Sequence, residues 1–344
     1  MVGSIGISVV SMKEWIALIF VLLLNGCLME EAERSNKELV LRHLYETTKA
    51  YYANFDQRPD FEAAYRLAQD ELNAQTTESE FFVICSRLLA SLEDPHIRLV
   101  TPDSTFLTFN YLNYERTVDL ARIKNHYLQD LYSENSRAVY GRLEQNIGYL
   151  YLPDFTDWTI YNQPPPEIQE AMNALRSTSG LIIDLRNNDG GSAIYAQALA
   201  AYFTQNQLLW HQSFNKNGPL PNDFDKAYQW FVNPSIHYYY NKPVIVLTSR
   251  YTVSAGERFV LAMKLLENAT VIGQRTAGSQ GSVRGFEMLN GWWFSLTFEK
   301  ILDANGYNWD YLGIAPDREI NTTLSQFPEG KDPLLEEAME ELGH

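Results

Sequence analysis

Apolar segments with the length of strands alternate with helix-like segments from residue 147 onwards, and this alternation restricts the fold more than any other feature. Each strand-like segment is almost continuously apolar, as expected for strands that are buried on both faces of a sheet. The sequence therefore predicts an α/β core with a buried, largely parallel sheet and helical crossovers. The strands are expected at 147–155, 181–186, 208–214, 244–249 and 270–273, and the helices after Pro164, at 193–203 and after Ser254.

The residues before this core have a different pattern. Apolar side chains recur at helical spacing through 35–93, beginning with a capping box at Ser35 and Glu38. We therefore expect a helical subdomain over 35–98 and, after it, a mixed connecting region over 99–146 with one helix near 118–132. The catalytic core is expected over 147–322, with further strands in 292–302, and a C-terminal tail helix in 323–344.

The first thirty residues indicate export. Residues Trp15 to Leu24 form an unbroken apolar run, too short to cross a bilayer that needs about 20 helical residues. The run ends in Leu24-Asn25-Gly26-Cys27, which resembles a bacterial lipobox. We therefore expect a lipoprotein signal peptide over 1–26, a lipid anchor on Cys27 and a tether over 27–34. An ordinary signal peptide with a coincidental cysteine remains the alternative. Both interpretations imply export, and the lipid anchor implies the cell envelope of a bacterium, on the outer side of the inner membrane or on the outer membrane.

Charge and cysteine content exclude several classes. The chain carries 27 Lys and Arg against 43 Asp and Glu, a net charge of −16, which argues against binding to nucleic acid. Its two cysteines exclude a disulfide scaffold and a cysteine-rich metal site. We expect Cys85 to be a core residue of a helix. No metal or cofactor is expected.

Three segments place reactive groups where α/β proteins gather them, at strand ends and helix N-termini. The first is the turn Asp184–Gly191, whose glycine N–H groups could bind an oxyanion or simply form a tight turn. The second is Thr252–Glu257, in which Ser254 is either a nucleophile or a plain helix cap. The third is Leu92–His96, whose histidine is a general base or a structural residue.

Six motifs in a fixed order carry a resemblance to a known family. They are Leu92/Asp94/His96, Gly148-Tyr149 with Phe155, Asp184 to Gly191, Ser254/Ala255/Glu257, Gly273/Thr276/Gly278 and Gly313 to Asp317. In this order they resemble the tail-specific, or carboxy-terminal processing, serine peptidases, which include the tricorn core protease. The resemblance covers 92–317 and implies a ClpP/crotonase-like β-β-α spiral core behind an N-terminal helical subdomain.

The resemblance also implies roles for particular residues. Ser254 matches the nucleophile, and the N–H groups of Ala255, Gly190 and Gly191 match the oxyanion hole. The processing proteases use a lysine where this chain has Ser279, so a Ser/Lys dyad is disfavoured. The tricorn-like branch uses the histidine, here His96, oriented by an acid that corresponds to Asp310. Asp189 replaces the usual proline before the glycines and adds a negative charge near the proposed oxyanion hole.

These assignments predict an exported serine endopeptidase that cleaves peptides or protein tails through Ser254, His96 and Asp310. The segment between His96 and the start of the catalytic core at residue 147 is too short for the PDZ module that many family members carry, so specificity is expected from the groove and from 99–146. One alternative is an inactive member of the fold that binds an apolar ligand or a peptide. The family's resemblance to the retinoid-binding repeats of the interphotoreceptor protein suggests this alternative. A crotonase-type acyl-CoA enzyme is a third possibility, but no basic pocket for the nucleotide phosphates is visible.

Overall fold

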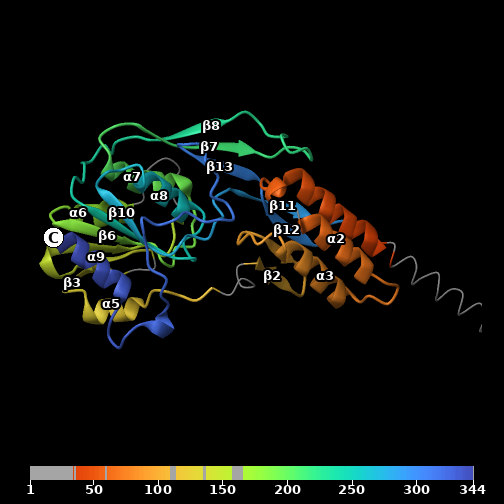
Figure 1. Cartoon of the computed structure of the whole chain (residues 1–344), viewed down its shortest axis with the longest axis horizontal. Coiled ribbons are helices and arrows are strands. Elements are labelled where there is room, and N and C mark those ends of the chain that lie inside the picture. Colours follow the sequence, from red (N-terminus) through yellow and green to blue (C-terminus); the bar gives the residue numbers. More distant parts are fainter. Residues whose placement is uncertain are drawn as a thin grey trace, which may run out of the picture.

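The computed structural model describes residue 34 and residues 36–58, 60–108, 114–134, 137–156 and 166–343. The expected signal peptide and Cys27 lie outside the described residues. Within them, no helix is both long and apolar enough to span a bilayer. The chain forms a helical unit at one end and a larger α/β core at the other (Figure 1).

The N-terminal part of the described chain forms the expected helical unit, although Ser35, the expected cap, lies outside the described residues. The unit consists of a helix over 36–51, α2 (Asp60–Glu71) and α3 (Glu78–Ala90). Thr77 caps α3, because its hydroxyl accepts the N–H of Glu80 while the Glu80 carboxylate accepts the N–H of Thr77. Cys85 lies on α3 with none of its surface exposed, which confirms the prediction that it is a core residue.

The helices share their core with a sheet that contains strands from a distant part of the chain. This sheet has the order β11-β12-β1-β2, made of β1 (Arg98–Val100), β2 (Thr105–Leu107), β11 (Val283–Glu287) and β12 (Trp293–Thr297). Met288, Trp292, Phe294 and Leu296 pack into one cluster with the buried faces of the helices. Residues 283–297, which we had assigned to the catalytic core, therefore complete the core of the helical unit.

The α/β core contains the predicted sheet, in the order β14-β10-β9-β6-β5-β4-β3. The strands from β14 to β5 are parallel, and β4 and β3 continue the sheet in antiparallel fashion. Strands β5, β6 and β9 are buried along their whole length, as their continuous apolar sequences predict. The strands are β3 (Asp130–Glu134), β4 (Val139–Arg142), β5 (Ile147–Tyr151), β6 (Gly180–Asp184), β9 (Val244–Thr248), β10 (Ala269–Gly273) and β14 (Arg318–Glu319).

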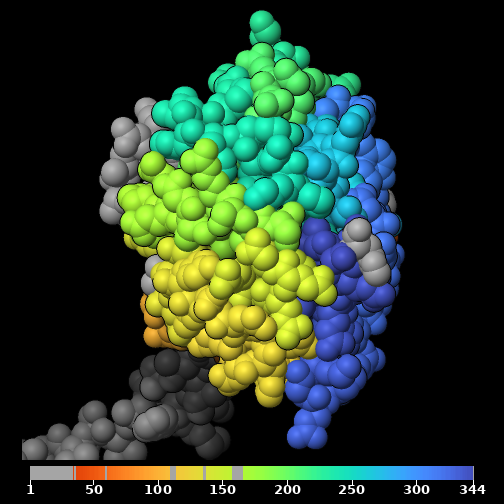
Figure 2. Space-filling model, turned by 90° about the vertical axis from the view of Figure 1, so that its left-hand side faces the viewer, coloured from red at the N-terminus to blue at the C-terminus, as the bar shows by residue number. Residues whose placement is uncertain are grey.

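Helices cover both faces of this sheet. One cluster contains residues of α6 (Pro166–Ala174), α7 (Ala193–Ala200) and α8 (Ala255–Met263). The other contains residues of α5 (Leu120–His126) and α9 (Pro333–Gly343). Figure 2 shows α9, dark blue, against the yellow segment that carries α5, where the Tyr127 hydroxyl donates to Glu336 at 3.0 Å.

A third sheet, in the order β13-β7-β8, lies beside the α/β core (Figure 1). It consists of β7 (Leu208–Asn215), β8 (Tyr228–Val232) and β13 (Glu299–Asp303). The strand expected at 208–214 therefore lies in this antiparallel sheet and not in the parallel one. The strands expected within 292–302 are present as β12 and β13, which belong to different sheets. The expected helix near 118–132 is shorter than predicted, because α5 ends at His126 and the chain then enters β3 at Asp130.

Candidate active site

Ser254 occupies a sharp turn between β9 and α8. Its backbone has φ 57° and ψ −118°, whereas an ordinary N-cap residue lies in the extended region. A non-glycine residue at positive φ is strained, and such strain concentrates at functional sites. A serine on a strained strand-to-helix turn presents its hydroxyl outward, as nucleophilic serines of hydrolases do. The backbone conformation therefore favours the nucleophile over the plain helix cap.

Hydrogen bonds to α8 and to the 276–279 loop hold this turn. The Ser254 N–H donates to Ser279 O at 3.0 Å and also faces Glu257 Oε2 at 3.2 Å. Glu257 lies on α8 with none of its surface exposed, and it also accepts from Thr276 Oγ1 and from the N–H groups of Gly278 and Ser279. The carboxylate thus ties the nucleophile turn to the 276–279 loop, and burial raises the pKa of Glu257 to about 7.

The pKa of Glu257 predicts a pH-dependent stability. Because the folded-state pKa lies above the ordinary value of 4.5, the folded chain binds the proton more tightly. The stabilisation that comes from protonated Glu257 is therefore complete below about pH 4.5, and it is lost as the pH rises through about 7. Between pH 4.5 and 7.5, the unfolding free energy of wild type should fall by about 3 kcal/mol relative to that of Glu257→Gln. Denaturant titrations at both pH values measure this difference, and the exposed Glu267→Gln is the control.

The glycine turn after β6 lies directly against Ser254. Gly190 has φ +81°, and a Cβ there would lie 2.5 Å from Ser254 Cβ. The N–H of Gly190 donates to Asn188 Oδ1 at 3.0 Å, so it is not free to bind an oxyanion. The N–H groups of Gly191 and Ala255 make no hydrogen bond within the described part of the chain. Of the three predicted oxyanion donors, Gly191 and Ala255 remain available.

Gly190→Ala should reduce activity strongly because the added methyl group would displace the nucleophile. We expect a loss of about 100-fold or more in the rate at which Ser254 reacts with a fluorophosphonate probe. Gly291→Ala is a matched control, because Gly291 also has φ +81° but a Cβ there would meet nothing within 4 Å. Equal losses of reactivity in the two variants would show that backbone strain, and not the contact with Ser254, is responsible.

His96 lies on the loop between α3 and β1. Asp94 Oδ1 accepts the His96 N–H at 2.9 Å, and Ser295 Oγ on β12 donates to His96 O at 2.8 Å. The side chain retains 15% of its surface, and burial is the main cause that lowers the pKa of His96 from 6.5. A base that is neutral near physiological pH is suited to take a proton from a hydroxyl.

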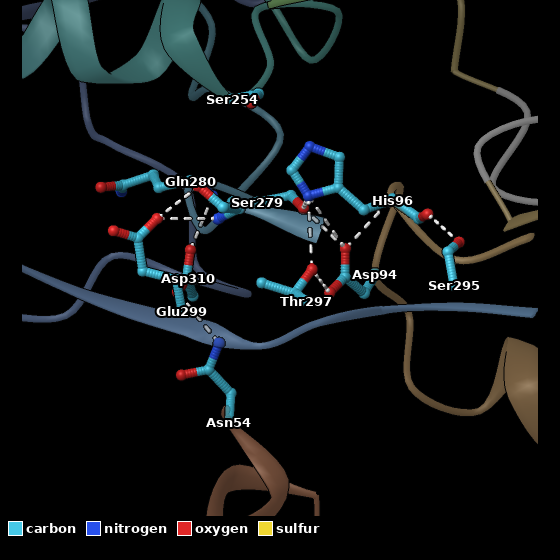
Figure 3. A network of polar contacts seen from close by, with 12 residues as sticks. Asn54, Asp94, His96, Ser254, Ser279, Gln280, Ser295, Thr297, Glu299 and Asp310 are labelled. Carbon is cyan, nitrogen blue, oxygen red and sulfur yellow. Dashed lines mark hydrogen bonds and ion pairs between the residues drawn. The ribbon is translucent and has the colours of Figure 1, made fainter. Parts of the chain in front are cut away.

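The His96 ring is held through Nδ1. This nitrogen lies 2.6 Å from Ser279 Oγ, 3.3 Å from Thr297 Oγ1 and 3.8 Å from Asp94 Oδ1 (Figure 3). Ser279 and Thr297 are almost fully buried. The sequence does not predict either contact. It identifies Ser279 only as the residue at the position of the relatives' lysine, and it gives no role to Thr297.

Ser279 connects His96 to Ser254. Its hydroxyl contacts Nδ1 of His96, and its carbonyl accepts the N–H of Ser254. No hydrogen bond joins Ser254 Oγ to the ring among the described residues, and Figure 3 shows Ser254 across the ring from Thr297 and Asp94. Catalytic contacts are commonly looser before substrate binds. Ser279 thus forms hydrogen bonds with both the predicted nucleophile and the predicted base.

The structure does not bring Asp310 to His96. Asp310 Oδ1 accepts the N–H of Gln280 at 2.8 Å, and Oδ2 accepts from Asn54 Nδ2 at 2.9 Å. The carboxylate is almost fully buried, and burial raises the pKa of Asp310 to about 6. Asp310 therefore binds the backbone of Gln280. This residue directly follows Ser279, whose hydroxyl contacts the ring of His96. Asp189, which was expected to add a negative charge near the oxyanion hole, is exposed to solvent.

The sequence is similar to those of a known protein family. Residues 146–320 match the model of peptidase family S41. The carboxyl-terminal-processing protease of Synechocystis is 25% identical over 71% of this chain and 54% of its own length. The tricorn protease of Thermoplasma volcanium is 25% identical over 60% of this chain and 18% of its own length. The chain thus spans about half of the first relative and less of the second.

Solved structures are similar to this chain over a larger share of its length than the relatives found by sequence. A protein from Parabacteroides merdae superposes with a TM-score of 0.79 and 27% identity, over 89% of this chain and 96% of its own. Mature CPAF superposes with a TM-score of 0.66 over 89% of this chain and 97% of its own, but its 14% identity supports the fold alone. Because the family model covers half of the sequence, including Ser254 and Ser279, the chain belongs to peptidase family S41.

Proposed function

We propose that this protein is a serine peptidase that hydrolyses peptides or protein tails, with Ser254 as nucleophile and His96 as general base. The observation that carries the proposal is the position of Ser279, which binds the backbone of Ser254 and the ring of His96 at the same time. The names of the relatives, carboxyl-terminal-processing protease and tricorn protease, support the choice of peptides and protein tails as substrates.

The chemistry follows from the positions of the side chains. Ser254 Oγ attacks the scissile carbonyl carbon while its proton passes to Nε2 of His96. The carbonyl oxygen becomes an oxyanion that accepts hydrogen bonds from the N–H groups of Gly191 and Ala255, each worth about 3 to 4 kcal/mol of barrier. His96 then returns the proton to the leaving amine. Water, deprotonated by the same ring, releases the acyl group and restores Ser254.

A fluorophosphonate probe tests this proposal without knowledge of the substrate. We expect one adduct, on Ser254, and none in Ser254→Ala. Ser249→Ala is a useful control, since Ser249 also follows β9 but its hydroxyl is buried and donates to the carbonyl of Arg186. Labelling of Ser249→Ala should match that of wild type. A folded wild-type protein without an adduct, under conditions in which a relative reacts, would indicate a binding module in place of a peptidase.

The cell location is a separate part of the proposal. It rests on the apolar run of residues 15–24 and on Leu24-Asn25-Gly26-Cys27, outside the described residues. We propose that Cys27 is lipidated and anchors the protein in the bacterial envelope. Incorporation of radiolabelled palmitate into the wild type, and its loss in Cys27→Ala, would support this. Equal incorporation in both would contradict it.

A further inference from the structure

The hydrogen bonds around Asp94 determine where the hydroxyl protons lie. Ser279 Oγ donates to Asp94 Oδ1 at 2.6 Å, and Thr297 Oγ1 donates to Asp94 Oδ2 at 2.7 Å. An ionised carboxylate can only accept, and each hydroxyl has a single proton to give. Because both protons are directed at Asp94, both hydroxyl oxygens can act only as acceptors toward a third group.

That third group is the His96 ring. Nδ1 lies 2.6 Å from Ser279 Oγ and 3.3 Å from Thr297 Oγ1. Since these oxygens can only accept, Nδ1 must carry the proton of the neutral imidazole. Nε2 is then left with its lone pair, which is the tautomer that a general base needs.

We propose that Asp94 and Ser279 are the positioning residues of the His96 base, with Thr297 as a weaker third. The Asp94 carboxylate fixes the Ser279 hydroxyl, and this hydroxyl fixes the Nδ1–H tautomer and the orientation of the ring. The inference rests on the proposed function, because the tautomer matters for activity only if His96 is the base. In this proposal Asp94 is the acid that orients His96, whereas the family resemblance gives this role to Asp310.

The same arrangement supports the charged ring during catalysis. When Nε2 takes the Ser254 proton, Nδ1–H continues to donate to Ser279. Asp94 Oδ1 lies 3.8 Å from Nδ1 of the positive ring. Asp94 stabilises the imidazolium and does not itself receive a proton. The site therefore needs no direct contact between carboxylate and imidazole, because the Ser279 hydroxyl bridges the two.

Several other groups act on the pKa of His96. Burial has the largest effect and lowers it, and Arg258 of α8 and Arg98 of β1 also lower it, whereas the Asp94 carboxylate raises it. Removal of the Asp94 charge should therefore lower the pKa of His96 further. Two further carboxylates hold the backbone of the network, since Glu257 accepts the N–H of Ser279 and Asp310 accepts the N–H of Gln280. Tyr52 is also nearby, and burial and then the Asp94 charge raise the pKa of its phenol.

Nitrogen-15 NMR of the imidazole rings in the full folded chain tests the assignment directly. The signal that disappears in His96→Gln identifies the ring. In wild type we expect the Nδ1–H tautomer. In Asp94→Asn the side-chain amide can itself donate to the hydroxyls, so we expect a mixture of tautomers and a lower pKa. The rate of fluorophosphonate labelling should fall about 100- to 1,000-fold in Asp94→Asn and about 10- to 100-fold in Ser279→Ala.

Two further variants separate positioning from general structure. Ser279→Thr keeps the hydroxyl and should recover labelling to within about threefold of wild type. Ser295→Ala removes a buried hydroxyl that bonds the His96 backbone but not its ring, so the Nδ1–H signal and the pKa should remain. Unchanged tautomer and reactivity in folded Asp94→Asn and Ser279→Ala would overturn the inference. Failure of wild type to label would instead overturn the proposed function, whatever tautomer the ring shows.

Discussion

His96→Ala should reduce the rate of Ser254 labelling by about 10⁴- to 10⁶-fold, the largest effect that we expect from any substitution outside the nucleophile. The alanine variant leaves the Ser254 hydroxyl without a proton acceptor, and no other imidazole contacts Ser279 among the described residues. The rate constant for adduct formation, measured by intact-protein mass spectrometry, gives the size of the loss.

His43→Ala is a suitable control for this experiment. His43 lies on the 36–51 helix of the same unit but outside the Ser279 network, so its replacement should leave labelling nearly unchanged. If His96→Ala is folded, as its circular dichroism and melting temperature would show, and still reacts at more than about a tenth of the wild-type rate, another group is the base.

Arg186→Ala should lower the free energy of unfolding by about 3 to 5 kcal/mol, the largest stability effect that we expect. Arg186 is fully buried at the end of β6. Its guanidinium donates to both carboxylate oxygens of Asp184, to Asp332 at 2.9 Å and to Thr117 O at 2.9 Å. The substitution would leave two buried carboxylates without their cation. Asp332 also accepts the N–H of Leu335, so α9 should loosen as well.

Arg142→Ala provides the comparison. Arg142 pairs with Asp130 on the surface, where both side chains are more than 40% exposed. Such pairs contribute little to stability because water and salt screen them. Urea denaturation of both variants measures the difference. A similar small loss for Arg186→Ala would mean that water replaces the guanidinium and that the buried network is not what holds α9.

The parts of the fold that were predicted correctly depend on local pattern. Strands β5, β6 and β9 carry continuous apolar sequences, and each formed where it was expected. The turn at Ser254 and the glycines of 190–191 were identified from short motifs, since a strained turn and close backbone approach require particular residues. These features can be predicted from sequence because neighbouring residues determine them.

The missed features depend on residues far apart in the chain. Ser279 and His96 are 183 positions apart, and Thr297 and His96 are 201 apart. No periodicity in a single sequence relates such residues, and a serine or a threonine alone carries no signal for a ring contact. The Leu92/Asp94/His96 motif contains Asp94, but the sequence alone assigns it no role. Only the fold reveals that Ser279 and Thr297 donate hydrogen bonds to its two carboxylate oxygens.

The pairing of β1 with β12 has a consequence for biosynthesis. Leu99 pairs with Phe294 and Val100 with Trp293, so the strand next to His96 gains this neighbour only after almost three hundred residues have been translated. Until then, the ring also lacks the Ser279 and Thr297 hydroxyls. A product that ends before Thr297 therefore lacks a complete set of contacts to the His96 ring.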